Sequence, residues 1–253
     1  MHHSYLIDTH CHIHESYELP IEDTLLEAKE AGVQKMLCVG TSEQSSRQAI
    51  AFANAHDEAY AVIGVHPHDT KDGYAGIASL AEEGAGKLVA IGEIGLDYFY
   101  THSPREVQIQ ALRDQIEVAI RYNLPIVFHV REAFDDFWPI FDSFEGIRGV
   151  LHSFTDSKEN MLKAIEKGLY IGVNGISTFT KDEAQKDMFD SIPLDKIMFE
   201  TDAPFLTPTP YRGKINQPAY VRIIAEYHAQ RRGISIEEIA TQSTRNARTL
   251  FSI

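Results

Sequence analysis

Short apolar runs alternate with longer amphipathic segments along the whole chain, and this alternation restricts the fold more than any other feature. We predict eight β-strands, each ending in polar or glycine-rich residues: Tyr5–Ile13, Gln34–Gly40, Ala59–Val65, Leu88–Leu96, Pro125–Val130, Gly149–Phe154, Tyr170–Gly175 and Ile197–Ala203. Most are apolar on both faces, as in parallel strands covered by helices. Eight β/α units in 253 residues predict an α/β fold, the eight-stranded parallel (β/α)8 TIM barrel, as a single domain over residues 1–253. An open doubly wound sheet is the alternative.

Capping signals predict helices between these strands. Ser103, Pro104 and Glu106 combine an N-cap, a first-turn proline and a capping-box partner. The apolar face that follows consists of Ile109, Leu112, Ile116 and Ile120. Further start signals are Thr41 with Gln44, Thr180 with Glu183, and Ser235 with Glu238, and the predicted helix stops are Gly32, Gly168 and Gly233. Segments 69–86 and 204–217 are predicted as weaker helices or loops.

The net charge of -14, from 37 acidic and 23 basic residues, argues against a protein that coats a nucleic-acid backbone nonspecifically through many Lys and Arg contacts. A small nuclease cleft stays compatible with it. Cys11 and Cys38 lie in apolar runs, where buried thiols are more common than disulfides or metal sites. No apolar run approaches the roughly 18 residues of a membrane span, and the polar start contains no signal core. We therefore expect a cytoplasmic protein without membrane association, and a monomer.

Two histidines, His10 and His12, close the first predicted strand. Strand alternation places both on the same side, which in a barrel is the interior near the catalytic end. Two imidazoles in this arrangement can share one metal ion. For this motif alone, a pair of hydrogen-bonded histidines without a metal is the alternative.

Similar polar residues end four other predicted strands: Glu93, His129, His152 and Asp202. A carboxylate is rarely buried in an apolar strand unless it is paired or bound to metal, and these runs contain no basic partners. We predict two divalent ions, one held by His10, His12 and Asp202, the other by His129 and His152, with Glu93 as the bridge. Such ions, about 3.5–4 Å apart, would lower the pKa of a shared water and clamp the oxygens of a displacement.

The predicted catalytic residues are Asp202, which would orient or deprotonate this water, and the bridging Glu93. Mixed nitrogen and oxygen ligands suit zinc, manganese or iron better than magnesium. The choice among Mg, Mn and Zn stays open.

Four motifs together resemble the TatD family of metal-dependent deoxyribonucleases, within the amidohydrolase superfamily: Asp8-Thr9-His10-Cys11-His12, Gly64-Val65-His66-Pro67-His68, Gly92-Glu93-Ile94-Gly95-Leu96-Asp97-Tyr98 and Glu200-Thr201-Asp202-Ala203-Pro204. The resemblance covers nearly the whole chain. It implies a TIM barrel that hydrolyses DNA phosphodiesters with two metals. The family's metal positions correspond to His10, His12, Glu93, His129, His152 and Asp202.

Substrate contacts are predicted on the barrel rim. The segment from Tyr211 to Pro218 is similar to a basic loop of the family, but has Gln217 where the family has an acid. Arg212 and Lys214 would contact phosphate, and Asn216 would brace the turn. An ordinary solvated loop is the alternative.

His66 would face substrate, or act as a structural histidine behind the ligands. Arg131 would neutralise a phosphoryl oxygen, or pair with Glu132 or Asp135. The aromatic run Tyr98 to Tyr100 would stack on bases or only pack.

Three functions compete. The first is a metal-dependent deoxyribonuclease, a 3'-5' exonuclease acting on single-stranded DNA or damaged ends through a hydroxide between two metals. The second is a small-molecule amidohydrolase or esterase with the same binuclear site, which the fold cannot distinguish. The third is a noncatalytic metal-binding protein, which would need a closed site.

Overall fold

A computed structural model describes residues 5–84, 86–100 and 102–253 of the chain. Its eight strands follow one another in chain order, β1 to β8, in one sheet, and the pairings within β3–β6 and between β7 and β8 are parallel. This order confirms the predicted (β/α)8 barrel class over the doubly wound alternative, in which the strand order reverses at a switch point. None of the helices in the described ranges is both long and apolar enough to cross a membrane.

The chain divides into two compact units. Unit 1 comprises Met1–Leu37 and Ser153–Ile253, and unit 2 comprises Cys38–His152. Strand β2 (Val33–Val39) runs across the border between them. The single domain over residues 1–253 stays a prediction.

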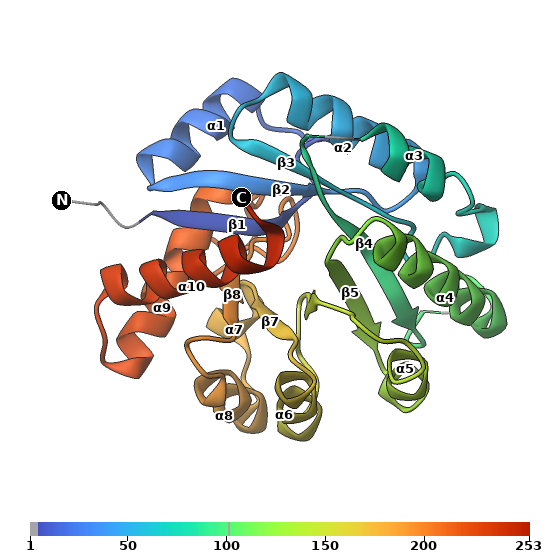
Figure 1. Cartoon of the computed structure of the whole chain (residues 1–253). Helices are drawn as coiled ribbons and strands as arrows, with labels where there is room; N and C mark the ends of the chain where they lie inside the picture. Colours follow the sequence, from blue (N-terminus) through green and yellow to red (C-terminus); the bar gives the residue numbers. More distant parts are fainter. Residues whose placement is uncertain (1–4, 85, 101) are drawn as a thin grey trace. The chain divides into compact units, whose positions relative to one another are not determined.

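Unit 2 contains four consecutive parallel strands, the helix before the first of them and the helices between them (Figure 1). Its strands are β3 (Ala59–Ile63), β4 (Leu88–Asp97), β5 (Ile126–Arg131) and β6 (Gly149–Leu151). Its helices are α2 (Glu43–Ala55), the 3-10 turn η1 (Thr70–Asp72), α3 (Ile77–Glu83), α4 (Arg105–Arg121) and α5 (Phe134–Phe141). The core contains fully buried Phe128 and Phe137.

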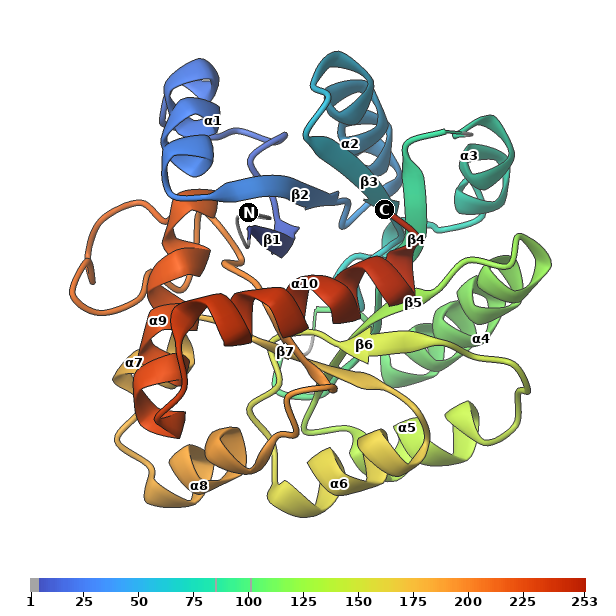
Figure 2. The same ribbon diagram turned by 60° about the vertical axis from the view of Figure 1, so that its left-hand side comes forward.

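Unit 1 combines the first strand with the last two. Its strands are β1 (Leu6–Cys11), β7 (Tyr170–Val173) and β8 (Ile197–Phe199), and its helices are α1 (Ile21–Glu30), α6 (Lys158–Glu166), α7 (Ile176–Phe179), α8 (Glu183–Ser191), η2 (Pro218–Tyr220), α9 (Val221–Arg232) and α10 (Ile236–Phe251). The long helix α10 lies next to α9 and packs on β1 and β8 (Figure 2). A parallel bridge between Cys11 and Ala203 continues the β1–β8 contact beyond the ends of the strands.

Five predicted strands end at least two residues earlier than expected: β1 at Cys11, β3 at Ile63, β6 at Leu151, β7 at Val173 and β8 at Phe199. Strand β6 ends at Leu151 and β8 at Phe199, so that His152 and Asp202 lie just after the strands. The backbone turns into the left-handed region at Ser153 (φ 48) and Asp202 (φ 59), which ends the extended conformation. Residue type and hydropathy do not reveal such local φ values.

The Ser235 cap of α10 is confirmed, because its side chain accepts a hydrogen bond from the Glu238 N–H. Three other predicted caps are wrong: Ser42 and Pro104 occupy the cap positions of α2 and α4, one residue after the predicted Thr41 and Ser103, and Asp182 caps α8, two residues after the predicted Thr180. Ser103 instead donates to the carbonyl of His68 at 2.6 Å. The capping pattern tolerates such shifts, because several side chains near each helix start can accept the same N–H groups.

The predicted apolar face of α4 is only partly correct, because Ile120 is 43% exposed. Gln108 and Gln115 are buried in its place. The Gln115 amide bonds to both backbone groups of Val65, and the Gln108 amide to both of Asp97. Their polar groups are thus satisfied, which removes the cost of burial, and α4 fixes the carboxyl end of β4.

Candidate metal centre

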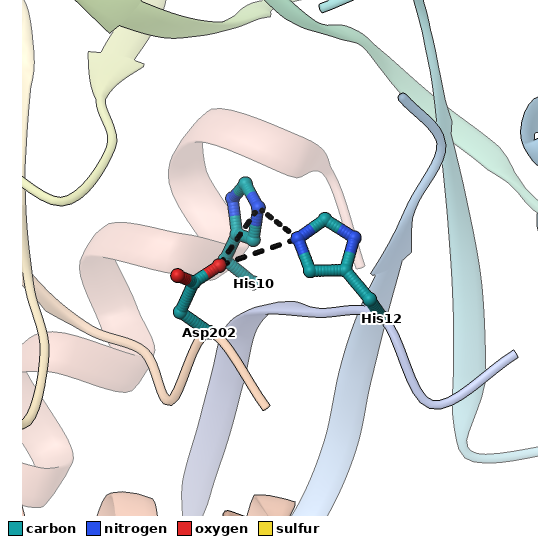
Figure 3. Close-up of side chains that lie close together, drawn as sticks. All are labelled: His10, His12 and Asp202. Carbon is teal, nitrogen blue, oxygen red and sulfur yellow. Dashed lines mark hydrogen bonds and ion pairs between the residues drawn. The ribbon is translucent and has the colours of Figure 1, made fainter. Parts of the chain in front are cut away.

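Unit 1 contains a buried group of three side chains, His10, His12 and Asp202 (Figure 3). The two Nε2 atoms lie 3.2 Å apart, and Asp202 Oδ1 lies 3.2 Å from His12 Nε2 and 3.7 Å from His10 Nε2. His10 is fully buried, and the Asp202 side chain is 15% exposed. The predicted alternation of His10 and His12 is confirmed, since both rings point to one carboxylate oxygen.

The backbone of β1 sets this geometry. The N–H of Asp202 donates to the carbonyl of His10 at 2.8 Å, and the N–H of His12 donates to the carbonyl of Ala203 at 2.7 Å. Below them, both oxygens of buried Asp8 accept hydrogen bonds from Thr201, at 2.8 Å from its N–H and 2.6 Å from its hydroxyl. Burial raises the pKa of Asp8 to about 8, against the effect of these hydrogen bonds. The segment before Asp202 is therefore tied directly to β1.

Unit 2 contains a second group around the Glu93 carboxylate on β4. Glu93 Oε1 lies 2.8 Å from His129 Nδ1, 3.5 Å from His66 Nε2 and 3.6 Å from His152 Nε2. The Glu93 side chain is 5% exposed, and the three imidazoles come from β5 and from the segments after β3 and β6. One carboxylate oxygen thus faces three imidazoles, two of which were predicted as metal ligands.

A second carboxylate, that of Asp97, contacts the ring nitrogen of His129 that does not face Glu93. Asp97 Oδ2 lies 2.9 Å from His129 Nε2 and 3.0 Å from His68 Nε2. Burial alone would raise the pKa of Asp97, but hydrogen bonds from His129 and the Tyr100 N–H lower it well below its ordinary value. Burial alone would lower the pKa of His129, but its bonds to Asp97 and Glu93 raise it.

The approach of β4 to β5 depends on glycine. Gly95 has φ 157, and a Cβ placed there would lie 1.7 Å from the carbonyl oxygen of His129. Gly95 is paired with His129 in the sheet register. A larger residue would push the strands apart between Glu93 and Asp97, the two carboxylates that hold the His129 ring.

The chemistry of the donors in both units fits a divalent metal ion. Three donor atoms lie within 4.8 Å of one another in the His10, His12 and Asp202 group, and likewise in the His66, Glu93 and His129 group. Imidazole nitrogen with carboxylate oxygen is a donor set typical of zinc, manganese or iron. Burial lowers the pKa of His66 well below its ordinary value, with a smaller effect of His129, which favours the neutral ring that a metal ligand needs.

Two predicted rim residues of unit 1, Asn216 and Arg212, hydrogen-bond to backbone carbonyls of the same unit. Asn216 is fully buried, and its amide donates to the carbonyls of Thr201 and Phe205. It braces the loop beside Asp202, as expected, and its burial leaves no surface for substrate. Arg212 donates to the carbonyl of Thr207 at 2.7 Å and lies 3.9 Å from the Phe179 ring centre.

The remaining rim residues, Lys214 and Arg131, are exposed, as Arg212 also is. The Lys214 ammonium lies 5.1 Å from the ring centre of Tyr211. In unit 2, the Arg131 guanidinium lies 3.8 Å from the ring centre of Phe99, and its residue is exposed. Arg131 therefore stacks on the aromatic loop after β4.

The contacts of Asp97 with His129 and His68 were not predicted from the sequence. One signal was present, because Glu93 and Asp97 are four residues apart, an even spacing that places them on the same side of a strand. His68 follows His66 by two residues, but lies beyond β3, where alternation no longer applies. Its contact with Asp97 depends on the loop conformation.

Comparisons with known proteins agree with this fold. The family model described as TatD related DNase matches residues 7–252. A Bacillus subtilis protein named uncharacterized metal-dependent hydrolase YabD is 38% identical, with 98% of this chain and 99% of that protein covered. The Salmonella typhimurium 3'-5' ssDNA/RNA exonuclease TatD is 35% identical, with 92% and 93% covered. The crystal structure of YjjV, a TatD homologue from Escherichia coli K12, matches with a TM-score of 0.89 and 28% identity, covering 98% of each chain.

Proposed function

Because this chain belongs to the TatD related DNase family, we propose that it is a metal-dependent deoxyribonuclease that hydrolyses phosphodiester bonds in DNA. Membership of this family shows that the chain is a hydrolytic enzyme. That it cleaves phosphodiester bonds, and that its substrate is DNA, is our proposal. The observation that supports it best is the buried group of His10, His12 and Asp202, with donor atoms within 3.7 Å of one another.

We assign one divalent ion to the donors of each unit. His10, His12 and Asp202 would hold the first ion, and Glu93, His129 and His152 the second. When bound, such an ion supplies Lewis acidity, which stabilises negative charge on a phosphate and makes water a better nucleophile. The bridging role of Glu93 is carried over from the sequence as a prediction. The donor atoms favour zinc or manganese over magnesium.

The protein's own groups would position the reactants. Asp202 would orient the attacking water and accept its proton, because its carboxylate is partly exposed next to two buried imidazoles. His66, kept neutral by burial, would hydrogen-bond a phosphate oxygen. Arg131 and Lys214 would pair with phosphates, whereas Arg212 and Asn216 would mainly keep the loop in place.

The finer activity we propose is 3'-5' exonuclease cleavage of single-stranded DNA. Its support is the name of the Salmonella relative, a 3'-5' ssDNA/RNA exonuclease that is 35% identical over most of both chains. A net charge of -14 also suits a substrate bound by few phosphates better than one bound along a long duplex. A monomer in the cytoplasm is proposed from the sequence, and the buried thiols of Cys11 and Cys38 agree with a reducing compartment.

End-labelled substrates test this function directly. The protein, loaded in turn with Mg²⁺, Mn²⁺ or Zn²⁺, is incubated with single-stranded DNA labelled at its 5' or its 3' end, and with RNA, phosphodiesters, esters and lactams. We expect a descending ladder from 5'-labelled DNA and immediate release of the 3' label, both abolished by EDTA. Turnover of lactams or esters without DNA cleavage would instead establish the amidohydrolase alternative.

A further inference from the structure

Two exposed aromatic rings lie next to each other in the loop after β4. Phe99 is 47% exposed and Tyr100 is 43% exposed. Their ring centres are 4.7 Å apart, with the planes nearly perpendicular at 86°. Burying such rings in water-excluded contacts is favourable, yet nothing in the described part of unit 2 covers them fully.

The rings are held in place by several contacts. Asp97 Oδ1 accepts the N–H groups of Phe99 and Tyr100, each at 3.0 Å. The Arg131 guanidinium lies over both rings, 3.8 and 5.1 Å from their centres. Tyr100 also stacks on His102 at 5.6 Å with an angle of 19°. A preorganised aromatic surface loses little conformational entropy when a ligand binds.

A continuous series of rings connects this surface to the Glu93 donor group, entirely within unit 2. Tyr100 lies 5.3 Å from His68, His68 lies 4.3 Å from His66, and His66 lies 4.4 Å from His129. A phosphate bound at the Glu93 group would therefore have an exposed aromatic surface close by. The base of a nucleotide is joined to its phosphate by one sugar, so a base binding site must lie near the phosphate site.

We propose that Phe99 and Tyr100, with Arg131 over them, form a stacking surface for a nucleobase of single-stranded DNA. This inference rests on the proposed deoxyribonuclease function and names how its substrate is held. A net charge of -14 weakens binding through phosphates alone, and stacking adds affinity that tolerates any base, because every base has a π-face. A guanidinium over the rings adds a cation that can reach the adjoining phosphate.

A base-dependent binding assay tests the proposal. The probe is a single-stranded oligonucleotide with uncleavable phosphorothioate ends, either with bases throughout or with abasic sites at its last two positions. Binding of the metal-loaded full chain is followed by fluorescence anisotropy. The wild type should bind the base-bearing probe about tenfold more tightly than the abasic probe. Phe99→Ser and Tyr100→Ala should lose most of this difference.

Matched variants separate stacking from general damage. Tyr100→Phe keeps the ring and should keep the preference for bases, and Leu162→Ala removes an exposed apolar side chain on α6, 52% exposed, without changing binding. Equal binding of both probes by a wild type that still cleaves DNA would overturn the stacking surface alone, and would point to a protein contact for these rings. A wild type that neither binds nor cleaves DNA would overturn the proposed function as well.

Discussion

The imidazole of His129 lies between two carboxylates: its Nε2 is 2.9 Å from Asp97 Oδ2, and its Nδ1 is 2.8 Å from Glu93 Oε1. Both ring nitrogens thus contact a carboxylate, and the two carboxylates come from one strand, β4. A hydrogen bond from the outer nitrogen of a ligating histidine fixes the tautomer and the orientation of its ring. If Asp97 accepts the Nε2 proton, Nδ1 is left to bind metal.

Asp97→Asn should weaken metal binding by about 10- to 100-fold, because the amide retains the shape but loses the charge that orients His129. Calorimetric titration of the metal-free protein with Mn²⁺ or Zn²⁺ measures this affinity. Asp136→Asn is the matched control, because it removes a carboxylate of unit 2 that binds Tyr98 and Arg105 instead. Equal metal affinities in the two variants would remove the role assigned to Asp97.

Glu93→Ala should abolish hydrolysis and release both ions together, because the bridging prediction makes each ion depend on this carboxylate. Metal content per chain, measured by atomic absorption after desalting, is the readout. His152→Ala serves for comparison, since it should remove only the second ion. Loss of a single ion from Glu93→Ala would show that Glu93 binds metal without bridging.

Asp202→Asn should leave the fold and DNA affinity nearly unchanged while lowering turnover by at least about 100-fold, the range of a lost general base. Asparagine tolerates the positive φ of 59 at this position. Single-turnover cleavage and anisotropy binding separate the two effects. A rate within a few-fold of the wild type would reject Asp202 as the group that acts on the water.

Lys214→Ala should reduce the slope of log affinity against log salt by about one, as expected for one lost phosphate contact. Arg212→Ala should mainly lower thermal stability, because its guanidinium binds the Thr207 carbonyl and packs on Phe179. Oligonucleotide binding over a salt series and thermal melting measure these effects. An unchanged slope in both variants would mean that this loop does not meet phosphate.

His228 in α9 should make the fold sensitive to acid. Burial lowers its pKa from 6.5 to about 3, with a smaller effect of Arg232, and its Nε2 lies 2.9 Å from Ser177 Oγ. The unfolded chain therefore binds a proton below pH 6.5 that the folded chain does not, so this group's contribution to stability is complete above pH 6.5 and is lost as the pH falls toward 3.

His228→Gln should flatten this dependence, because glutamine retains a donor for Ser177 but does not titrate. Between pH 6.5 and about pH 4.5, the wild type should lose about 2–3 kcal/mol more of its free energy of unfolding than the variant. Urea denaturation across this range provides the measurement. Parallel pH profiles would show that His228 is protonated as easily in the folded chain as in the unfolded one.

Local pattern was sufficient for the strands and most of the candidate ligands. The strands are buried on both faces, so their apolar runs are visible in the sequence, and polar residues at their ends stand out. The ends of the strands and the buried face of α4 were harder to predict from the sequence. Ser153 and Asp202 leave the extended conformation through positive φ values, and the α4 face includes two glutamines whose burial depends on backbone partners in other segments.

By itself, the sequence determined the (β/α)8 fold class, the side of β1 that His10 and His12 share, and the residue types available to bind metal, because strand period and strand ends are local properties. The tertiary structure decided that Asp97 and Glu93 hold opposite nitrogens of His129, that Asn216 is buried, and that Arg131 lies on Phe99. These contacts join segments far apart in the chain. They follow from strand register, loop conformation and side-chain rotamers, which periodicity and composition do not encode.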